Sequence, residues 1–276
     1  MAALPRAGHG ARLPDALSSF SLLAAIALLT LAAVQGPQWG WTSAPFLLLL
    51  AAALLITAFT VRRTIPHPHA LIEAGLFRSR QFTVASIALF VFFLGFAAWL
   101  LSTVLFFENV WHYSALRTGM AIAPGPLTAA LFAVNSGRIA SVFGRRVPAV
   151  VGPLLLAVGG AYWLLLAPAH PAYAADFLPA LIVAGAGSGM TQAPLSASAG
   201  SLPPDRATTG SAVLNMSRQV GSALGIAILV ALLAVPQPHA LAAFHRGWVF
   251  LILTSVAAAL TTVIGGRRAR APQYNL

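Results

Sequence analysis

Residues 82–107 read FTVASIALFVFFLGFAAWLLSTVLFF, a stretch of 26 residues without a charged side chain. A helix rises about 1.5 Å per residue and the hydrocarbon core of a bilayer is about 30 Å thick, so about 20 apolar residues are enough to cross it. The stretch is too long for a barrel strand and lacks the alternation of apolar and polar residues that such a strand shows. It therefore predicts a transmembrane helix.

The rest of the chain has the same character. Of its 276 residues, 59% are hydrophobic and only 8% are charged, whereas soluble domains average about 45–50% apolar and about 25% charged residues. This composition excludes a soluble enzyme, a nucleic-acid-binding module and a disordered tail, and it indicates an integral membrane protein. Cysteine is absent, which excludes disulfides, thiolate metal ligands and a cysteine nucleophile.

We expect an all-α fold with about eight transmembrane helices. The domains we expect are a two-span hairpin (residues 1–65), a cytoplasmic linker (66–81) and a six-span bundle with a short cytoplasmic tail (82–276). Arg6 and Arg12 precede the first apolar stretch as they would in a signal peptide, but this stretch is longer than the usual signal core of about 7–15 residues. The eight stretches are 16–35, 44–61, 82–107, 119–135, 148–167, 177–199, 211–235 and 248–264.

The arginines predict an orientation for these helices. All 16 basic residues are arginines. With the N-terminus in the cytoplasm and eight crossings, only Arg117 and Arg246 fall outside and the other 14 fall inside. This is the bias that the positive-inside rule requires, so both termini are expected in the cytoplasm. The tryptophans and the tyrosine near the outer helix ends are interpreted as interfacial anchors: Trp39, Trp41, Trp111, Tyr113 and Trp248.

Glycine and proline mark two of the spans. Gly185 and Gly189 are four residues apart and share one helix face, which favours close helix packing. Pro194 should bend the same helix, and the alternative to plain packing is a kinked helix that lines a polar cavity. The triplet Pro124-Gly125-Pro126 removes backbone donors from another span, so it predicts either a simple kink or a gate of the kind that transporters use.

The stretch 211–235 carries a polar stripe. Ser211, Asn215, Arg218, Ser222 and Gly225 recur every three or four residues and so share one helix face. A charge within a span is costly unless it faces a cavity or a partner, although a long side chain can also reach back to the cytoplasmic surface. Arg218 therefore either lines a cavity or snorkels. Gln192 is predicted to line the same cavity, and Gly221 is predicted to pack closely against another helix.

Several of these segments together resemble the fourteen-span drug:proton antiporters of the major facilitator superfamily (EmrB/QacA-like). The segment 137–146, GRIASVFGRR, is similar to that superfamily's cytoplasmic signature loop, Gly-x-x-x-Asp-Arg-x-Gly-Arg-Arg, and we interpret it as a loop. Segments 76–82, 185–194 and 215–225 resemble the start of the second half and two later helices, and the Trp39-Gly40-Trp41 turn resembles the extra pair of spans. The signature residues retained here are Gly137, Arg138, Gly144, Arg145 and Arg146.

Two departures from the family matter. Ser141 and Val142 replace the Asp and Arg of the signature loop, so its charge-pair lock is not expected here. The resemblance also covers only the linker spans and the C-terminal half, which implies that a six-span N-terminal half is missing. A cavity shared between two halves is the usual basis of alternating access.

The acidic residues bear on proton coupling. All five lie at the ends of the predicted spans or in loops, whereas a proton carrier is usually a buried titratable group. Glu108 and Asp176 are the nearest candidates, and exposed helix ends are the competing interpretation. The seven histidines also lie outside the apolar stretches, and His67-Pro-His69 lacks a third ligand, so no metal site is predicted.

The resemblance implies a plasma-membrane transporter that exports amphipathic or cationic drug-like molecules in exchange for protons. Its partners would be lipid, the substrate, protons and the missing half, with no nucleic acid and no cofactor. The alternative is a truncated remnant without transport activity, or a membrane scaffold that pairs through its glycine faces. An enzyme is not expected, because the spans contain no Ser/His dyad and no His/Glu metal pair.

Overall fold

The computed structural model describes residues 16–40, 42–64, 74–167, 171–234 and 240–266. Throughout these residues the chain forms helices and short turns, with no strand. The all-helical fold predicted from the sequence is therefore confirmed. The termini, Trp41 and the histidine pair at 67 and 69 lie outside the described residues.

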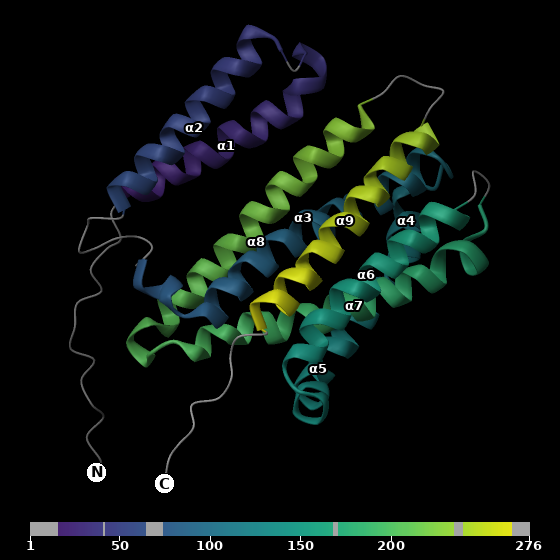
Figure 1. The fold of residues 1–276 in the computed structure, drawn as a ribbon. Helices are drawn as coiled ribbons and strands as arrows, with labels where there is room; N and C mark the ends of the chain where they lie inside the picture. The colour runs from purple at the N-terminus through teal and green to yellow at the C-terminus, as the bar shows by residue number, and fades with distance from the viewer. Residues whose placement is uncertain (1–15, 41, 65–73, 168–170, 235–239, 267–276) are drawn as a thin grey trace, which may run out of the picture.

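Seven of the predicted spans each fall mainly on one long helix of the described residues, and the span 119–135 falls across two helices, Ala115–Ile122 and Pro124–Phe143 (Figure 1). Five helices are long and apolar enough to cross a membrane, namely Arg80–Asn109, Arg146–Leu166, Tyr173–Ser201, Arg206–Leu233 and Leu241–Gly265. The elements are α1 (Ala16–Trp39), α2 (Ala44–Thr64), η1 (Ala74–Arg78), α3 (Arg80–Asn109), α4 (Ala115–Ile122), α5 (Pro124–Phe143), α6 (Arg146–Leu166), η2 (Tyr173–Phe177), α7 (Leu178–Ser196), η3 (Ala197–Ser201), α8 (Pro204–Leu233) and α9 (Ala240–Gly266).

Helix α3 lies at the centre of the bundle. It packs against α8 on one side and α9 on the other, while α9 packs against α6, α6 against α7, and α7 against α5. Helices α1 and α2 pair with each other and contact the bundle through α1 and α8 (Figure 1). A buried hydrogen bond from Thr60 Oγ1 to Ser21 Oγ, at 2.8 Å, joins the two helices of this hairpin.

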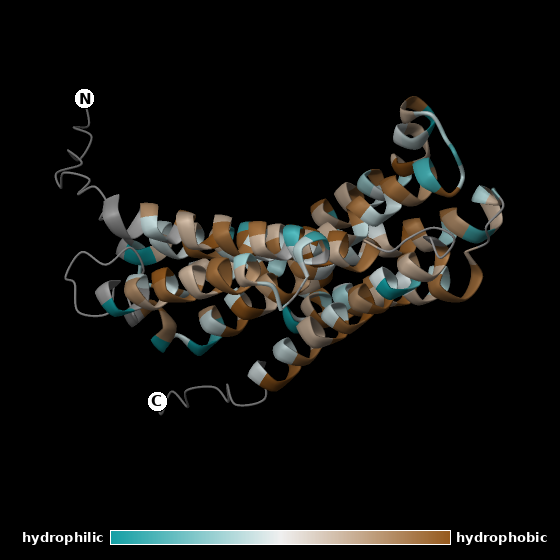
Figure 2. Ribbon diagram, turned by 90° about the horizontal axis from the view of Figure 1, so that it is seen from above, coloured by the Kyte–Doolittle hydropathy of each residue, from teal (hydrophilic) through white to brown (hydrophobic). Residues whose placement is uncertain are grey.

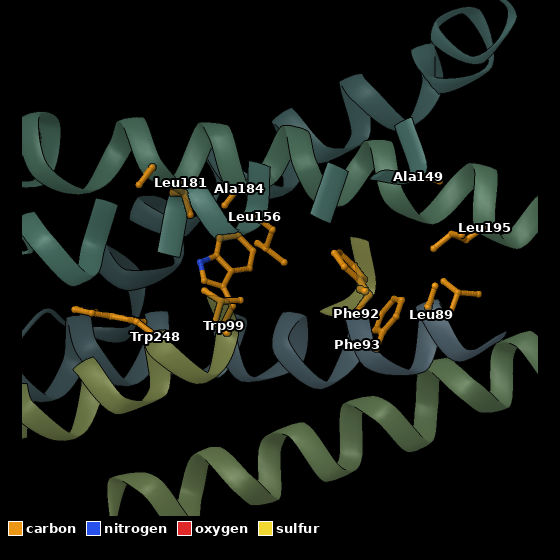
Figure 3. Packing of buried hydrophobic residues seen from close by; sticks show 14 of the residues in the cluster. Leu89, Phe92, Phe93, Trp99, Ala149, Leu156, Leu181, Ala184, Leu195 and Trp248 are labelled. Carbon is orange, nitrogen blue, oxygen red and sulfur yellow. The ribbon is translucent and has the colours of Figure 1, made fainter. Parts of the chain in front are cut away.

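The helices are hydrophobic along most of their length, and hydrophilic residues gather mainly toward their ends (Figure 2). Side chains of α3, including Leu89, Phe92 and Trp99, point toward α6 and α7, where they meet residues such as Leu156 and Leu181 (Figure 3). All five of these side chains are buried. The core of the bundle therefore lies between α3 and the α6–α7 pair.

Aromatic rings fill the core at one end of the bundle. The Phe177 ring lies 4.1 Å from the Trp163 ring and 5.5 Å from the Phe106 ring, measured between centroids, and is stacked on both. The Trp163 indole N–H also donates a hydrogen bond of 3.2 Å to the Phe177 carbonyl oxygen. Trp248 completes the cluster, with its ring 5.3 Å from that of Phe106.

The anchor interpretation is wrong for three of the aromatic residues. Trp111, Tyr113 and Trp248 are 4%, 8% and 0% exposed, so their rings face the protein core and not the lipid interface. The physical reason is that the helix ends converge here, and each ring gains more contact from other rings than from lipid headgroups. Trp39 is 40% exposed, which fits an anchor.

The predicted loop at 137–146 is also wrong. Helix α5 continues to Phe143, and only Gly144 and Arg145 separate it from α6. No proline interrupts residues 137–143, and Gly144 ends the helix because its φ of 84° lies in the left-handed region that favours glycine. The start of the fourth span differs as well, because α4 begins at Ala115 and the chain bends at Ala123 before α5.

Two other helices begin earlier than predicted. Helix α8 starts at Pro204, a favoured first position for proline, so Arg206 lies in its first turn. Helix α9 starts at Ala240, so Arg246 lies within a helix and not in an outer loop. The expectation that 211 and 248 mark helix starts failed because polar side chains are tolerated in helix segments that extend beyond the hydrocarbon core.

Replacing Trp163 by alanine should destabilise the bundle by about 3–5 kcal/mol, because it removes a fully buried ring from the aromatic cluster. Leu165→Ala is the matched control, because Leu165 is 79% exposed and follows Trp163 by two residues on the same helix. This substitution should lower the free energy of unfolding by about 0.5 kcal/mol or less. Unfolding of the purified protein in mixed micelles, followed by circular dichroism, measures both. Equal costs for the two variants would contradict the cluster's role.

Candidate functional site

Arg218 lies near the middle of α8. It is 14 residues from the start of a 30-residue helix, which places it about 21 Å along the helix axis at about 1.5 Å per residue. Its Nη2 atom donates a hydrogen bond of 3.4 Å to Gln192 Oε1 on α7. Its guanidinium carbon lies 4.8 Å from the centroid of the Phe93 ring on α3. The structure therefore brings together three residues from three helices.

The charge of Arg218 is only partly compensated. The contact with the Phe93 ring is a cation–π interaction, which stabilises a guanidinium more strongly where water is excluded. The Nε atom is buried and has no hydrogen-bond partner among the described residues. A buried donor without a partner is costly, so the local structure leaves Arg218 able to bind one more acceptor. These two contacts join the side chain to α3 and α7, and Gln192 lies four residues before the end of α7. Whether Arg218 lines a cavity or reaches toward the cytoplasmic surface stays a prediction.

The other residues of the polar stripe are less enclosed. Ser222 is half-buried, and Asn215 and Ser211 are exposed on the described surface. Ser211 is occupied locally, since its hydroxyl donates to the Ala207 carbonyl oxygen at 3.0 Å. Asn215 and Ser222 share the face of Arg218 by helical spacing. The stripe thus leads from the solvent-accessible end of α8 toward the Arg218–Gln192 contact.

Phe93 is the residue of this cluster that sequence reasoning missed. It stands in a run of phenylalanines at 90, 92, 93 and 96 of α3, where nothing in the pattern distinguishes one ring from another. Only the packing of α8 on α3 selects Phe93 as the ring beneath the guanidinium. A sequence signal would have required knowing which two helices are neighbours.

The glycines of α7 lie against two different helices. A Cβ atom at Gly185 would come within 2.5 Å of the Gly125 carbonyl oxygen on α5, and one at Gly189 would collide with the Ala129 carbonyl on the same helix. Gly187 points the other way, where a Cβ would lie 2.8 Å from the Leu156 nitrogen on α6. Alternating glycines therefore let α7 fit between α5 and α6.

A second pair of glycines sets the distance between α8 and α3. A Cβ at Gly221 would lie 2.5 Å from the Phe90 carbonyl oxygen, and one at Gly225 would lie 2.9 Å from the Leu94 Cα atom. These contacts hold the backbone of α8 close to α3, one turn away from Arg218. Small residues permit such approach in membranes, where helix association depends on close van der Waals contact.

The prolines lie where helices change course. Pro124 is the first residue of α5, directly after the bend at Ala123, and Pro126 follows two residues later. Neither proline has a backbone N–H to donate, so the hydrogen-bond ladder between α4 and α5 is interrupted there. Pro194 lies inside α7, two residues before that helix ends and passes into η3. Whether these breaks move during function stays a prediction.

The remaining candidates lie at the two opposite ends of the bundle. Arg145 and Arg146 begin α6 beside Gly144, and Gly137 and Arg138 lie in the last two turns of α5. Glu108 ends α3 and Asp176 lies in η2, and both are half-buried at the other end. The structure does not bring either carboxylate to Arg218. Among the described residues, no three His, Asp or Glu side chains come close enough together to hold a metal ion.

The helical order, the close glycine contacts and the arginine-bearing hairpin between α5 and α6 can be compared with known families. Residues 16–226 match the Major Facilitator Superfamily. The chain belongs to the major facilitator superfamily.

Several curated relatives are bacterial proteins named for drug resistance or drug efflux. Over 225 residues the chain is 28% identical to the multidrug resistance protein Stp of Mycobacterium tuberculosis. This alignment covers 81% of this chain and 41% of Stp. It is 28% identical over 224 residues to the drug efflux pump JefA of the same species, covering 80% of this chain and 43% of JefA. It is 25% identical over 210 residues to the methylenomycin A resistance protein of Streptomyces coelicolor, covering 75% and 43%.

The match to these relatives is consistent in extent. This chain spans about two-fifths of the length of each of them. Membership in this family and the apolar helices of the described residues together indicate a multi-pass membrane protein.

Adding a methyl group at Gly189 should destabilise the bundle by about 1–3 kcal/mol, because the new Cβ meets the backbone of α5, which cannot rotate out of the way. The matched control is Gly137→Ala on α5, where a Cβ would meet nothing within 4 Å. That substitution should be neutral or stabilise by up to about 1 kcal/mol, since alanine favours helix over glycine. Thermal unfolding of both purified variants gives the comparison. If Gly189→Ala were as stable as Gly137→Ala, the close approach of α5 and α7 would be disproved.

Proposed function

We propose that this chain is the C-terminal portion of a proton-driven drug exporter of the fourteen-span type and supplies one wall of its substrate cavity. The observation that carries the proposal is the Arg218–Gln192–Phe93 cluster, which lies about midway along α8 at the meeting of three helices. A transporter of this superfamily is expected to hold its substrate site near the bilayer midplane. A polar group there that lacks a full set of partners is costly to keep unless it serves such a site.

The cavity wall we propose consists of Arg218 and Gln192 at its deepest point, with Asn215 and Ser222 above and below on α8. The aromatic face of Phe93 adds a surface on which a flat apolar or cationic group can stack. An amphipathic molecule would therefore find hydrogen-bonding and stacking groups side by side. That the substrates are drugs is supported by the relatives, which include a multidrug resistance protein and a drug efflux pump. The preference for amphipathic or cationic compounds is proposed from these polar and aromatic groups.

We further propose that transport requires a six-span N-terminal half. Alternating access needs two bundles that rock about a shared site, and the described helices make up one bundle and a hairpin. The exposed side chains Asn215 and Ser211 support this, because a polar surface at membrane depth requires a partner or a water-filled cavity. The relatives Stp and JefA are long enough to contain a further half of this kind, since the match covers only 41% and 43% of them.

Proton coupling requires a titratable group that senses the occupation of the substrate site. Glu108 and Asp176 lie at the end of the bundle away from the arginine-bearing turns, so neither is placed to sense occupation of the Arg218 site directly. We therefore propose that the principal proton carrier is contributed by the N-terminal half, with these two carboxylates as secondary candidates. The side chains of the other three acids are not among those described.

The orientation we propose places both termini in the cytoplasm of a plasma-membrane protein. Support comes from the helix ends that carry arginine: Arg80 at the start of α3, Arg145 and Arg146 at the start of α6, and Arg206 at the start of α8 all lie at one end of the bundle. The opposite end holds Arg117 and Arg246. The positive-inside rule assigns the arginine-rich end to the cytoplasm.

A scaffold that pairs through its glycine faces is the weaker alternative. The glycines that would serve it, Gly185, Gly189, Gly221 and Gly225, are already covered by α5 or α3 of the same chain. A second copy could not reach them without separating those helices. A remnant without transport activity is the other alternative, and the first experiment below separates it from a working half.

A chimaera in which this chain replaces the matching portion of Stp should accumulate a lipophilic cationic dye inside inverted vesicles, whose outer face is the cytoplasmic one, when their lumen is made acidic. The chain alone, at equal abundance, should accumulate none above empty vesicles, because it lacks the second wall of the cavity and a central proton carrier. Dye fluorescence measures both. Export by the chain alone would contradict the half-transporter proposal, and a folded but inactive chimaera would favour the remnant.

Within the active chimaera, Arg218→Ala should lower the rate of efflux by about tenfold or more, since charge-assisted hydrogen bonds contribute about 1.5–3 kcal/mol. Arg218→Lys should recover part of the loss, because it restores the charge without the planar guanidinium. Gln219→Ala is the matched control on the neighbouring, exposed position of α8 and should leave efflux unchanged. An unchanged rate in Arg218→Ala would reduce Arg218 to a packing residue.

A further inference from the structure

A cavity of about 220 Å³ opens at the arginine-bearing end of the bundle, and neither Arg218 nor Gln192 lines it. Four helices form it: the starts of α3 and α6, and the ends of α7 and α9. None of the cavity-wall residues proposed for the substrate lines it. It is therefore a separate feature, and nothing in the transport cycle described above makes use of it.

The rim of this cavity is strongly basic. Arg80, Arg145 and Arg146 line it, and no acidic residue is among the lining residues. Arg80 is held in place by a hydrogen bond of 3.3 Å from its Nη2 atom to the Ile264 carbonyl oxygen at the end of α9. Among the described residues, neither Arg145 nor Arg146 has an acidic partner. All three side chains are exposed at the rim, so together they make the mouth of the cavity attractive to an anion.

A buried hydroxyl lies in the wall of the same cavity. Ser198 of η3 lines the cavity and is only 3% exposed, and its Oγ atom has no hydrogen-bond partner among the described residues. Thr262 also lines the cavity and donates its hydroxyl hydrogen to the Ala258 carbonyl oxygen at 3.1 Å. A buried hydroxyl without a partner destabilises the protein, and a ligand oxygen in the cavity would remove that cost.

The start of α6 adds to the attraction for an anion. Arg145 caps this 21-residue helix, and no side chain accepts a hydrogen bond from its first turn. The aligned peptide dipoles place a partial positive charge there, which favours a negative group. The arginines, the hydroxyl and the helix end thus all favour the same kind of ligand, an anion with several acceptor oxygens.

The walls below the rim are apolar. Val84 and Ala85 of α3, Ala149 of α6, and Pro194 and Leu195 of α7 line them. A small inorganic anion would leave these walls in contact with water. A molecule with an anionic head and an apolar body would cover them, and such molecules surround this part of the protein in a membrane.

We propose that this cavity is a binding site for the phosphate headgroup of an acidic phospholipid. Arg145 and Arg146 contact the phosphate oxygens, Ser198 donates its hydroxyl hydrogen to one of them, and the glycerol and the start of the acyl chains lie against the apolar walls. A headgroup held here bridges α3, α6, α7 and α9, so it fastens the end of the bundle at which those four helices meet. No covalent step is involved.

The test uses the purified chain in detergent and dioleoyl phosphatidylglycerol, with dioleoyl phosphatidylcholine as the lipid of equal acyl chains and no net charge. Native mass spectrometry measures how many lipids of each kind remain bound and at what dissociation constant. We expect one phosphatidylglycerol to be retained at least about tenfold more tightly than phosphatidylcholine, since each arginine near an acidic lipid contributes about a fivefold gain.

The double variant Arg145→Gln/Arg146→Gln should weaken phosphatidylglycerol binding by about 25-fold, on the same basis of about fivefold for each arginine. The matched control is Arg62→Gln/Arg138→Gln, which removes two exposed charges from other helices at the same end, neither of them in the cavity. The control should bind phosphatidylglycerol as the unmodified chain does. Equal weakening in both double variants would show attraction to general surface charge and overturn the site.

Ser198→Ala keeps the fold intact while removing only the hydroxyl, so it guards against a variant that fails to fold. Without lipid it should be at least as thermally stable as the unmodified chain, because an unpaired buried hydroxyl is lost. With phosphatidylglycerol it should bind about tenfold more weakly, since a hydrogen bond to a charged oxygen is lost. A variant with unchanged phosphatidylglycerol affinity would overturn the role of Ser198.

A competition experiment with inorganic phosphate distinguishes a lipid headgroup from a free anion. If millimolar phosphate displaced phosphatidylglycerol and stabilised the chain equally well by itself, the site would belong to a free anion and the lipid assignment would be wrong. If phosphate neither displaced the lipid nor stabilised the chain, the apolar walls would be shown to contribute, as proposed. Equal retention of the two lipids by the unmodified chain would overturn the site altogether.

Discussion

Direct contact between helix backbones is the interaction on which this structure depends. Lipid tails are as apolar as the side chains, so helices in a membrane gain little from hiding apolar surface and associate through close van der Waals contact. Helix α7 achieves this on two sides, with Gly185 and Gly189 against α5 and Gly187 against α6. Gly221 and Gly225 bring α8 equally close to α3. Between α7 and α8, Arg218 donates a hydrogen bond to Gln192.

The two ends of the bundle differ in their physical character. At one end, stacked rings centred on Phe106, Trp163 and Phe177 leave little space and hold the helices together by aromatic contact. At the other end, arginines surround an open cavity whose wall holds an unpaired hydroxyl. The two ends therefore differ in the groups between their helices: aromatic rings in contact at one end, and charged and polar side chains around a cavity at the other.

Charge placement explains much of the proposed function. Only one arginine of the described helices lies near mid-depth, and it is held by an aromatic ring and a neutral amide in place of a carboxylate. Neither described carboxylate reaches it, so its charge is available to a substrate or to a group on a facing bundle. The acids at the helix ends are poorly placed to couple proton binding to that site, which is why a second half enters the proposal.

The sequence by itself determined that the chain crosses a membrane as helices and roughly where each helix lies, because the length and hydrophobicity of a segment suffice to decide whether it enters lipid. It also showed which positions carry glycine, proline and arginine. It mispredicted the loop at 137–146, the helix starts near 211 and 248, and the anchor role of Trp111, Tyr113 and Trp248, because each of these depends on what packs nearby. Only the tertiary structure decided that Phe93 lies beneath Arg218, that Gly187 faces α6 while its neighbours face α5, and that Ser198 lies in the wall of a basic cavity. The physical reason is that hydrophobicity is a property of each segment alone, whereas a contact between helices depends on the rotation and neighbours of both.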